Sequence, residues 1–468
     1  MIGDRLAGRA RRLTERVTQS ATTSSTGTAA REPAPVDLSQ QTPYAGCDPK
    51  RPGTPAITAP HVLVSGPTGR GKTTRILAPG AIQWVGPRVI VSSKTDYLKW
   101  VVEKGVAKRG KVHILDLAGE LDPEYPWLQG IDYQMVTSDP TALVTSDDEA
   151  LAMASLLLTV GSLGASEGAG SGNDAFWQTL STQLLAALLL AGRDSGGGIR
   201  WTRSAAGRPE GEGPEDTTPS WTYAYALLEG RSLHAEDLLT KLGMDAKLRD
   251  SVTATMQAGL APWLLSTVAG SGDSSAVPFR PSMLEGPDEP TLAIIAPADG
   301  VAAGAAVAVI ETVIRHWRRG VERGLPRVLL SVDEAVNTAP IPKLTTYITE
   351  ARGLGVACVI AVQSTNQLTL RWGKEGADVL RDVFPAVLIL EGAPERELIE
   401  QASWWSGETD RWTESIDSGS HRSLSSERAQ RVSAQSLLPR RVEEGRLLLY
   451  GQAGMRVDLP PIWEWPDA

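Results

Sequence analysis

The sequence predicts an α/β fold with a mostly parallel sheet, interrupted along the chain by a block of helices. Short apolar runs typical of buried strands alternate with helical segments in two regions, 46–146 and 269–468. Such alternation is typical of a parallel sheet with helices on both faces. The intervening region, 147–268, is almost wholly helical in its pattern. We therefore expect one α/β domain, made of the two outer regions, with an all-α domain inserted between them.

Apolar runs and helical periodicity place the individual elements. Strands are expected at 61–65, 89–91 and 112–115, and after the helical region at 291–295, 328–332, 356–362, 386–390 and 446–450. The residues 72–77 are expected to start a helix, and further helices are expected at 147–163, 174–191, 301–319, 344–352 and 394–404. Shorter helices are expected between the loop 193–219 and about residue 268. The longest loops are expected at 164–173, 193–219 and 407–440.

The first 45 residues differ in composition from the rest of the chain. Residues 1–17 place four apolar side chains on one helical face with arginines elsewhere, which predicts a basic amphipathic helix. The alternative is a solvated tail. Residues 18–45 are rich in Ser, Thr, Ala and Pro, a composition typical of a disordered linker. We expect 1–45 to lie outside the α/β domain.

Composition and hydropathy exclude several classes of protein. No apolar stretch approaches the ~18 residues that a membrane-spanning helix needs, and arginines interrupt any signal-like core near the start. Cys47 and Cys358 lie far apart, which excludes a disulfide scaffold and suits a reducing cytoplasm. A net charge of −9 argues against a protein that coats nucleic acid with its whole surface, but it leaves a narrow basic pore open. We expect a cytoplasmic chain, with 1–17 as the candidate for a peripheral contact at the inner face of the cell membrane.

A phosphate-binding motif follows the first predicted strand. Residues 66–73 read Gly-Pro-Thr-Gly-Arg-Gly-Lys-Thr and fit G-x-x-x-x-G-K-[ST] between a strand and a helix. The glycines let backbone N–H groups converge on phosphate oxygens, Lys72 reaches the β- and γ-phosphates, and the Thr73 hydroxyl binds Mg²⁺. The alternative is an ordinary glycine-rich turn. The candidate nucleotide-binding residues are Gly66, Pro67, Thr68, Gly69, Arg70, Gly71, Lys72, Thr73 and Thr74.

An acidic pair follows the apolar strand 328–332. Asp333 is expected to hold Mg²⁺ through water, and Glu334 to polarise the attacking water. The alternative for such a pair is a helix N-cap. A glutamate at this position favours a nucleotide hydrolase over a small-molecule kinase, because a kinase has no use for activated water.

Two further residues are candidates for catalysis. Gln363 stands directly after the strand 356–362, and strand ends at that edge of a parallel sheet face the nucleotide crevice. Arg352 ends the preceding predicted helix, and it is a candidate for neutralising charge in the transition state, in its own or a neighbouring subunit. The alternatives are a polar residue satisfying a strand end and a helix C-cap cation.

Together, these motifs resemble those of the coupling proteins of conjugation and type IV secretion, the VirD4/TraG/TraD group of hexameric ATPases related to the FtsK and HerA DNA translocases. The resemblance runs from about 60 to 464. It includes the phosphate loop, the acidic pair, Ala-Arg-Gly-Leu-Gly-Val at 351–356, Val-Gln-Ser at 362–364 and Asp-Ala-Phe-Trp at 174–177. It implies a RecA-like P-loop NTPase domain that binds ATP and Mg²⁺, and it makes Arg352 the arginine that acts across subunits.

Two features depart from the family pattern. The family usually has N-terminal transmembrane helices, and we expect none in this chain. The usual Asp-Pro-Lys-Gly-Glu-like stretch is Ser-Ser-Lys-Thr-Asp at 92–96. We therefore leave Lys94 and Asp96 out of the predicted site.

The resemblance implies an ATP hydrolase that moves DNA, or a DNA–protein complex, to a type IV secretion or conjugation channel. Its expected partners are DNA in a central pore, a relaxase or accessory proteins, a channel or membrane subunit, and further copies of the chain in a homo-hexamer. One alternative is a soluble translocase or packaging motor of the FtsK/HerA type. Another is an adaptor that binds ATP and recruits cargo with little hydrolysis.

Overall fold

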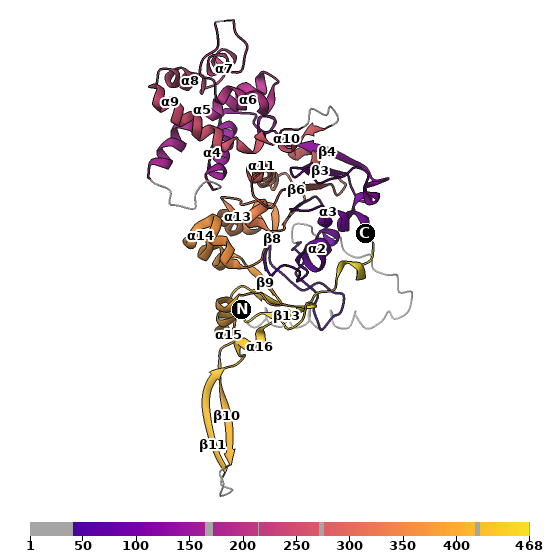
Figure 1. The fold of residues 1–468 in the computed structure, drawn as a ribbon. Helices are drawn as coiled ribbons and strands as arrows, with labels where there is room; N and C mark the ends of the chain where they lie inside the picture. Colours follow the sequence, from indigo (N-terminus) through magenta and orange to yellow (C-terminus); the bar gives the residue numbers. More distant parts are fainter. Residues whose placement is uncertain (1–40, 164–171, 214, 271–275, 417–421, 468) are drawn as a thin grey trace, which may run out of the picture. The chain divides into compact units, whose positions relative to one another are not determined.

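The computed structural model describes residues 41–163, 172–213, 215–270, 276–416 and 422–467 (Figure 1). Within them, one 11-stranded sheet runs in the order β13-β12-β9-β1-β8-β7-β2-β6-β3-β4-β5. Its strands are β1 (His61–Ser65), β2 (Arg88–Ser92), β3 (Val112–Asp116), β4 (Tyr133–Thr137), β5 (Val277–Pro278), β6 (Thr291–Ile295), β7 (Val328–Val332), β8 (Val356–Val362), β9 (Ala386–Leu390), β12 (Glu444–Leu449) and β13 (Met455–Asp458). Among the described residues of this sheet, β12 pairs antiparallel with β9 and with β13, and the other neighbouring strands are parallel, so the prediction of a mostly parallel sheet is confirmed.

Both faces of the central strands are buried under helices. In β1, Leu63 faces one apolar core and Val62 and Val64 face the other, as the alternation of a strand requires. The helices α2 (Ala78–Gln83) and α3 (Asp96–Glu103) supply side chains to the second core, and α11 (Ala303–Gly320) supplies the first. Burial on both faces explains why these strands read as continuous apolar runs in the sequence.

The predicted helical region lies in the chain between β4 and β5. It contains α4 (Asp147–Leu163), α5 (Gly172–Asp194), α6 (Gly198–Ala206), α7 (Trp221–Leu228), α8 (Ala235–Leu242), α9 (Ala246–Gly259) and α10 (Ser266–Ala269). Its apolar side chains join the same core as α11, so this region shares its core with one face of the sheet. At the crossing of α4 and α9, a Cβ on Gly161 would lie 2.8 Å from the Cα of Gly259. Only glycine fits this close approach.

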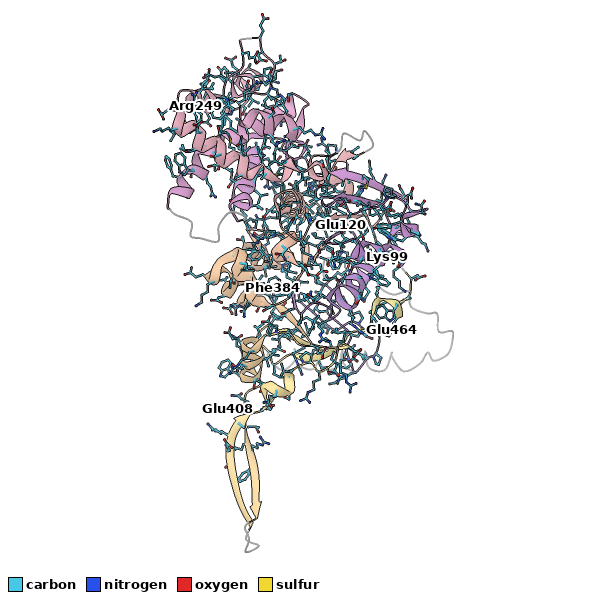
Figure 2. All side chains as sticks on the ribbon, viewed as in Figure 1. Lys99, Glu120, Arg249, Phe384, Glu408 and Glu464 are labelled. Atoms are coloured by element: carbon cyan, nitrogen blue, oxygen red, sulfur yellow. The ribbon has the colours of Figure 1, made fainter. Side chains whose placement is uncertain are left out.

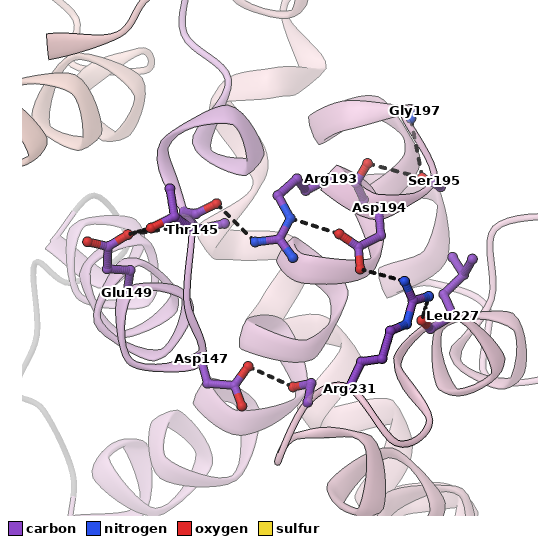
Figure 3. Close-up of polar contacts among 12 residues, drawn as sticks. Thr145, Asp147, Glu149, Arg193, Asp194, Ser195, Gly197, Leu227 and Arg231 are labelled. Carbon is purple, nitrogen blue, oxygen red and sulfur yellow. Dashed lines mark hydrogen bonds and ion pairs between the residues drawn. The ribbon is translucent and has the colours of Figure 1, made fainter. Parts of the chain in front are cut away.

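Polar contacts close the ends of the two longest helices of this region (Figure 3). The carboxylate of Glu149 accepts hydrogen bonds from the backbone N–H and the hydroxyl of Thr145, at 3.0 and 2.6 Å, at the start of α4. At the end of α5, Asp194 accepts a hydrogen bond of 2.8 Å from Arg193 and pairs with Arg231 of the segment after α7. Glu149 also pairs with Arg319 of α11 at 2.8 Å, which ties the helical region to the sheet's own covering helix.

Two predicted loops contain regular structure instead. Residues 193–219 include α6, whose buried face is short and flanked by glycines. Residues 407–440 include α16 (Ala434–Leu437) and a two-stranded hairpin, β10 (Glu408–Ile416) and β11 (Arg422–Gln430). Among the described residues, this hairpin pairs with no other strand. The described hairpin residues are mostly exposed, so the sequence carries no apolar alternation there, and cross-strand partners such as Arg411 and Glu427 are matched in charge instead. The prediction of loops in these two stretches is wrong.

Smaller differences concern elements whose sequence signal is weak. The strands β4, β5 and β13 lie towards the two edges of the sheet and are partly exposed, and the sequence pattern misses them. It also misses α3 and α14 (Thr369–Val383). The predicted helix 394–404 is α15 (Arg396–Trp405), and the helix 344–352 divides into α13 (Leu344–Glu350) and the turn η8 (Ala351–Leu354). The predicted helix 1–17, nearly all of the linker 18–45 and most of the loop 164–173 lie outside the described residues.

None of the helices among the described residues is long and apolar enough to cross a membrane.

Candidate functional site

The phosphate loop leaves the carboxyl end of β1 and enters a wide, π-type helical turn, η2 (Lys72–Leu77), which continues as α2. Gly69 and Gly71 have φ angles of 78° and 81°, in the left-handed region that side chains other than glycine adopt with strain. Lys72 lies inside the loop, where its Nζ donates to the carbonyl oxygens of Gly66 and Pro67 at 2.7 and 3.3 Å. The loop thus has the geometry in which backbone N–H groups and one lysine surround a phosphate.

Asp333 directly follows β7 and faces the first residues of η2. Its Oδ2 accepts a hydrogen bond of 2.7 Å from the Thr73 hydroxyl, across 260 residues of sequence. The side chain of Asp333 is only 8% exposed, and its other oxygen, Oδ1, is buried without a hydrogen-bond partner in the described structure. Burial raises the pKa of Asp333, opposed by Thr73 and by the charge of Lys72. A buried carboxylate oxygen beside a threonine hydroxyl fits Mg²⁺, which prefers oxygen ligands.

Glu334 has a strained backbone. Its φ and ψ of 52° and 48° are left-handed, which is uncommon outside glycine and is typical of functional sites when it occurs. It is the N-cap residue of α12 (Ala335–Thr338), but its side chain makes no capping hydrogen bond to that helix. Its carboxylate accepts a hydrogen bond of 3.3 Å from Nε2 of Gln363, at the end of β8. The fold therefore brings together these two predicted catalytic residues.

One cavity of about 390 Å³ contains most of the predicted site. Of the candidate residues, Thr68, Gly69, Gly71, Lys72, Thr73, Thr74, Asp333 and Glu334 line it. The charges of Asp333 and Glu334 raise the pKa of Lys72, although burial outweighs them and lowers it overall. Arg70 points elsewhere and pairs with Glu391 at 3.0 Å. Lys94 and Asp96, which are not among the predicted site residues, line the same cavity.

Arg352 lies at the opposite end of the central strands from the phosphate loop. It is part of η8, which directly precedes the amino end of β8, whereas the phosphate loop follows the carboxyl end of β1. The two strands are parallel and adjacent, with His61 opposite Cys358 and Ser65 opposite Val362. The seven residues of β8 therefore separate the two ends by about 20 Å. The fold does not bring Arg352 to the phosphate loop of its own chain.

Glu395, which sequence reasoning missed, joins the ends of β1 and β8. Its carboxylate accepts hydrogen bonds from the Ser65 hydroxyl at 2.5 Å and from the N–H and hydroxyl of Thr365 at 2.7 and 2.5 Å. It is 5% exposed. Ser65 precedes the phosphate loop and Thr365 follows Gln363 by two residues, so Glu395 holds the two segments in register. No motif surrounds it in the sequence, and only the folded chain identifies it.

Comparisons with known proteins agree with this architecture. Residues 327–443 match the family described as the TraM recognition site of TraD and TraG. The bacterial conjugative coupling protein TrwB, in an unbound monoclinic form, matches with a TM-score of 0.57 and 19% identity, over 88% of this chain and 87% of that one. No curated protein matches the sequence.

Two structures of TrwB with bound nucleotide have the same fold. The complex with the ATP analogue ADPNP matches with a TM-score of 0.57 and 18% identity, over 87% of each chain. The complex with ADP and Mg²⁺ matches with a TM-score of 0.52 and 19% identity, over 88% of each chain. The predicted fold class, an α/β domain with a mostly parallel sheet and an all-α part, is confirmed, and the TrwB structures share this fold. The comparisons support the resemblance to the type IV coupling proteins.

Proposed function

We propose that this chain, which resembles the type IV coupling proteins in its motifs and fold, hydrolyses ATP with Mg²⁺ to move DNA or a DNA–protein complex towards a conjugation or secretion channel. The observation that carries the ATPase assignment is the content of one cavity. It contains the phosphate loop, a buried carboxylate paired with Thr73, and a glutamate oriented by Gln363.

Each side chain of the cavity has a defined task in hydrolysis. Lys72 and the loop N–H groups bind the β- and γ-phosphates. Thr73 and Asp333 would hold Mg²⁺, and the ion would neutralise charge on the phosphate oxygens. Glu334 accepts the proton of the attacking water, and the amide of Gln363 keeps the glutamate aimed into the cavity. The water oxygen bonds to the γ-phosphorus as the bond to the bridging oxygen of ADP breaks.

The position of Arg352 supports a ring of identical subunits. An arginine side chain spans six bonds, or about 7 Å when extended. This is far less than the distance between the two ends of the central strands. The assignment of a catalytic role therefore requires a ring in which the end of the sheet that carries Arg352 faces the phosphate loop of a neighbouring subunit. We therefore assign Arg352 to the neighbour's site in a homo-hexamer, as the family resemblance implies.

The proposed partners follow from the matched segment and from the family. Residues 327–443 match a region that recognises TraM in TraD and TraG, and here the segment includes the exposed hairpin β10–β11. We propose that accessory proteins or a relaxase dock on this segment, that DNA occupies the central pore, and that a channel or membrane subunit recruits the ring to the inner face of the membrane.

The purified chain tests the proposal by its Mg²⁺-dependent ATP hydrolysis, measured with and without DNA. Glu334→Gln should bind ATP with nearly the wild-type Kd but lose hydrolysis, because an amide does not accept the proton of the water. Glu120→Gln, at an exposed carboxylate labelled in Figure 2, is the matched control and should hydrolyse normally. Wild-type turnover in Glu334→Gln would remove the assignment of the catalytic base.

A further inference from the structure

The nucleotide cavity continues beyond the phosphate loop, towards the carboxyl-terminal segment of the chain. Arg75 and Trp463 line both this cavity and a neighbouring one of about 550 Å³, so these two side chains lie where the cavities meet. Val442 lines the nucleotide cavity as well. The hydrolysis mechanism proposed above assigns no role to Arg75, Val442 or Trp463.

Trp463 is a large aromatic residue that is 58% exposed but held on a fixed turn. It belongs to η10 (Ile462–Glu464), whose Ile462 is fully buried. Its ring contacts that of Trp100 on α3, with centroids 6.2 Å apart and planes inclined at 51°. Figure 2 labels Glu464 and Lys99, the sequence neighbours of the two tryptophans. An exposed indole held in place by packing is ready to bind a flat ligand without further ordering.

Arg75 fixes this turn relative to the phosphate loop. It belongs to η2, and its guanidinium donates to the carbonyl oxygen of Leu459 at 2.5 Å and pairs with Glu443 at 3.5 Å. Its charge is therefore committed to the carboxyl-terminal segment and is not free for a phosphate. Because η2 begins at Lys72, the same short helix carries the phosphate-binding lysine and the anchor of the segment that contains Trp463.

We propose that Trp463 is the base-stacking residue of the nucleotide site and that it binds the purine ring of a nucleoside triphosphate by its indole face. This inference rests on the proposed nucleotide binding and adds the base subsite to it. With Arg75 committed and Val442 apolar, these three residues read no hydrogen-bonding pattern on the base. Since every purine has a π-face, the site should accept ATP and GTP with similar affinity.

Binding measurements on the full chain test the proposal with three probes: ATP, GTP and inorganic tripolyphosphate, which has no base. Trp463→Ala should raise the Kd for ATP and GTP by about 10- to 100-fold and leave the Kd for tripolyphosphate unchanged. Trp463→Phe should recover most of the lost affinity, because it keeps an aromatic face. Trp404→Ala, at another tryptophan that is 69% exposed and lies on α15, is the control and should bind all three probes normally.

The outcomes separate this inference from the proposed function. Wild-type affinity for ATP in Trp463→Ala would overturn the stacking role, and so would an equal loss of ATP and tripolyphosphate, which would show that the tryptophan only shapes the loop. A strong preference of the wild type for ATP over GTP would overturn recognition by stacking alone. If the wild type binds neither ATP nor tripolyphosphate, the nucleotide site itself is wrong.

Discussion

Replacement of Arg352 by alanine tests the ring arrangement most directly. The backbone of Arg352 precedes β8, and the phosphate loop follows the other end of the adjacent parallel strand β1. The separation of about 20 Å is nearly three times the ~7 Å that an extended arginine side chain reaches. Within one chain, the substitution therefore removes no contact with the nucleotide. Any effect on hydrolysis must pass through a neighbouring subunit or through folding.

The expected loss of hydrolysis is large. Arginines that neutralise transition-state charge contribute on the order of 10³-fold or more in P-loop enzymes, equivalent to about 4 kcal/mol of activation free energy. The Kd for ATP should change less than about threefold, since Lys72, Thr73 and the loop backbone supply the contacts of the bound state. Steady-state hydrolysis and equilibrium binding, measured on the same preparation, give the two values.

A mixing assay decides between the neighbour's site and a local role. Arg352→Ala subunits keep an intact site, and Glu334→Gln subunits keep an intact arginine. Random assembly of equal amounts makes about one interface in four complete, so the mixture should recover a large part of that fraction of wild-type activity. A mixture of Arg352→Ala with the double variant Arg352→Ala/Glu334→Gln contains no such arginine and should stay inactive. Failure of the first mixture to recover, with both variants folded and co-assembled, would refute the reasoning.

Three further predictions concern stability, positioning and the hairpin. Asp333→Asn should abolish Mg²⁺-dependent hydrolysis yet raise the free energy of unfolding without Mg²⁺ by about 1 kcal/mol, because burial raises the pKa of Asp333 and an amide has no charge to bury. Protonated Asp333 stabilises the wild type at low pH, and this contribution is lost as the pH rises through the folded-state pKa. In denaturant titrations, the gain in unfolding free energy of Asp333→Asn over the wild type should therefore grow from acidic to neutral pH. An equal gain at acidic and neutral pH would contradict the argument. Glu395→Ala should lower kcat more than ATP affinity and lower the free energy of unfolding by about 1–3 kcal/mol, because Ser65 and Thr365 lose their acceptor. Glu395→Gln keeps an acceptor and should have most of the wild-type kcat. Equal defects in both variants would show that the charge of Glu395 itself matters. Replacing 408–430 by a short Gly-Ser linker should leave Tm and basal ATP hydrolysis unchanged, since β10 and β11 pair with each other and with no other described strand. A fall in either value would show that the hairpin supports the core.

The sequence alone determined the features of this protein that depend on neighbouring residues. The phosphate loop is recognisable because consecutive residues and their backbone N–H groups do the binding, so its pattern stays intact along the chain. Asp333 and Glu334 were predicted because they directly follow a strand buried on both faces, and such strands read as unbroken apolar runs. The strands 61–65, 291–295, 328–332, 356–362 and 386–390 were predicted with the observed bounds for the same reason.

Only the tertiary structure decided which distant residues meet. It pairs Thr73 with Asp333 and aims Gln363 at Glu334. It keeps Arg352 at the end of the strands opposite to the phosphate loop. It also places Glu395 between two strand ends, and Trp463 beside the phosphate cavity, although neither stands in a recognisable motif. A hydrogen bond or a stacked ring depends on the distance between atoms, and strand order and register set that distance. Separation along the chain does not set that distance. A parallel sheet places residues hundreds of positions apart at the same end of its strands, and residues about ten positions apart at opposite ends.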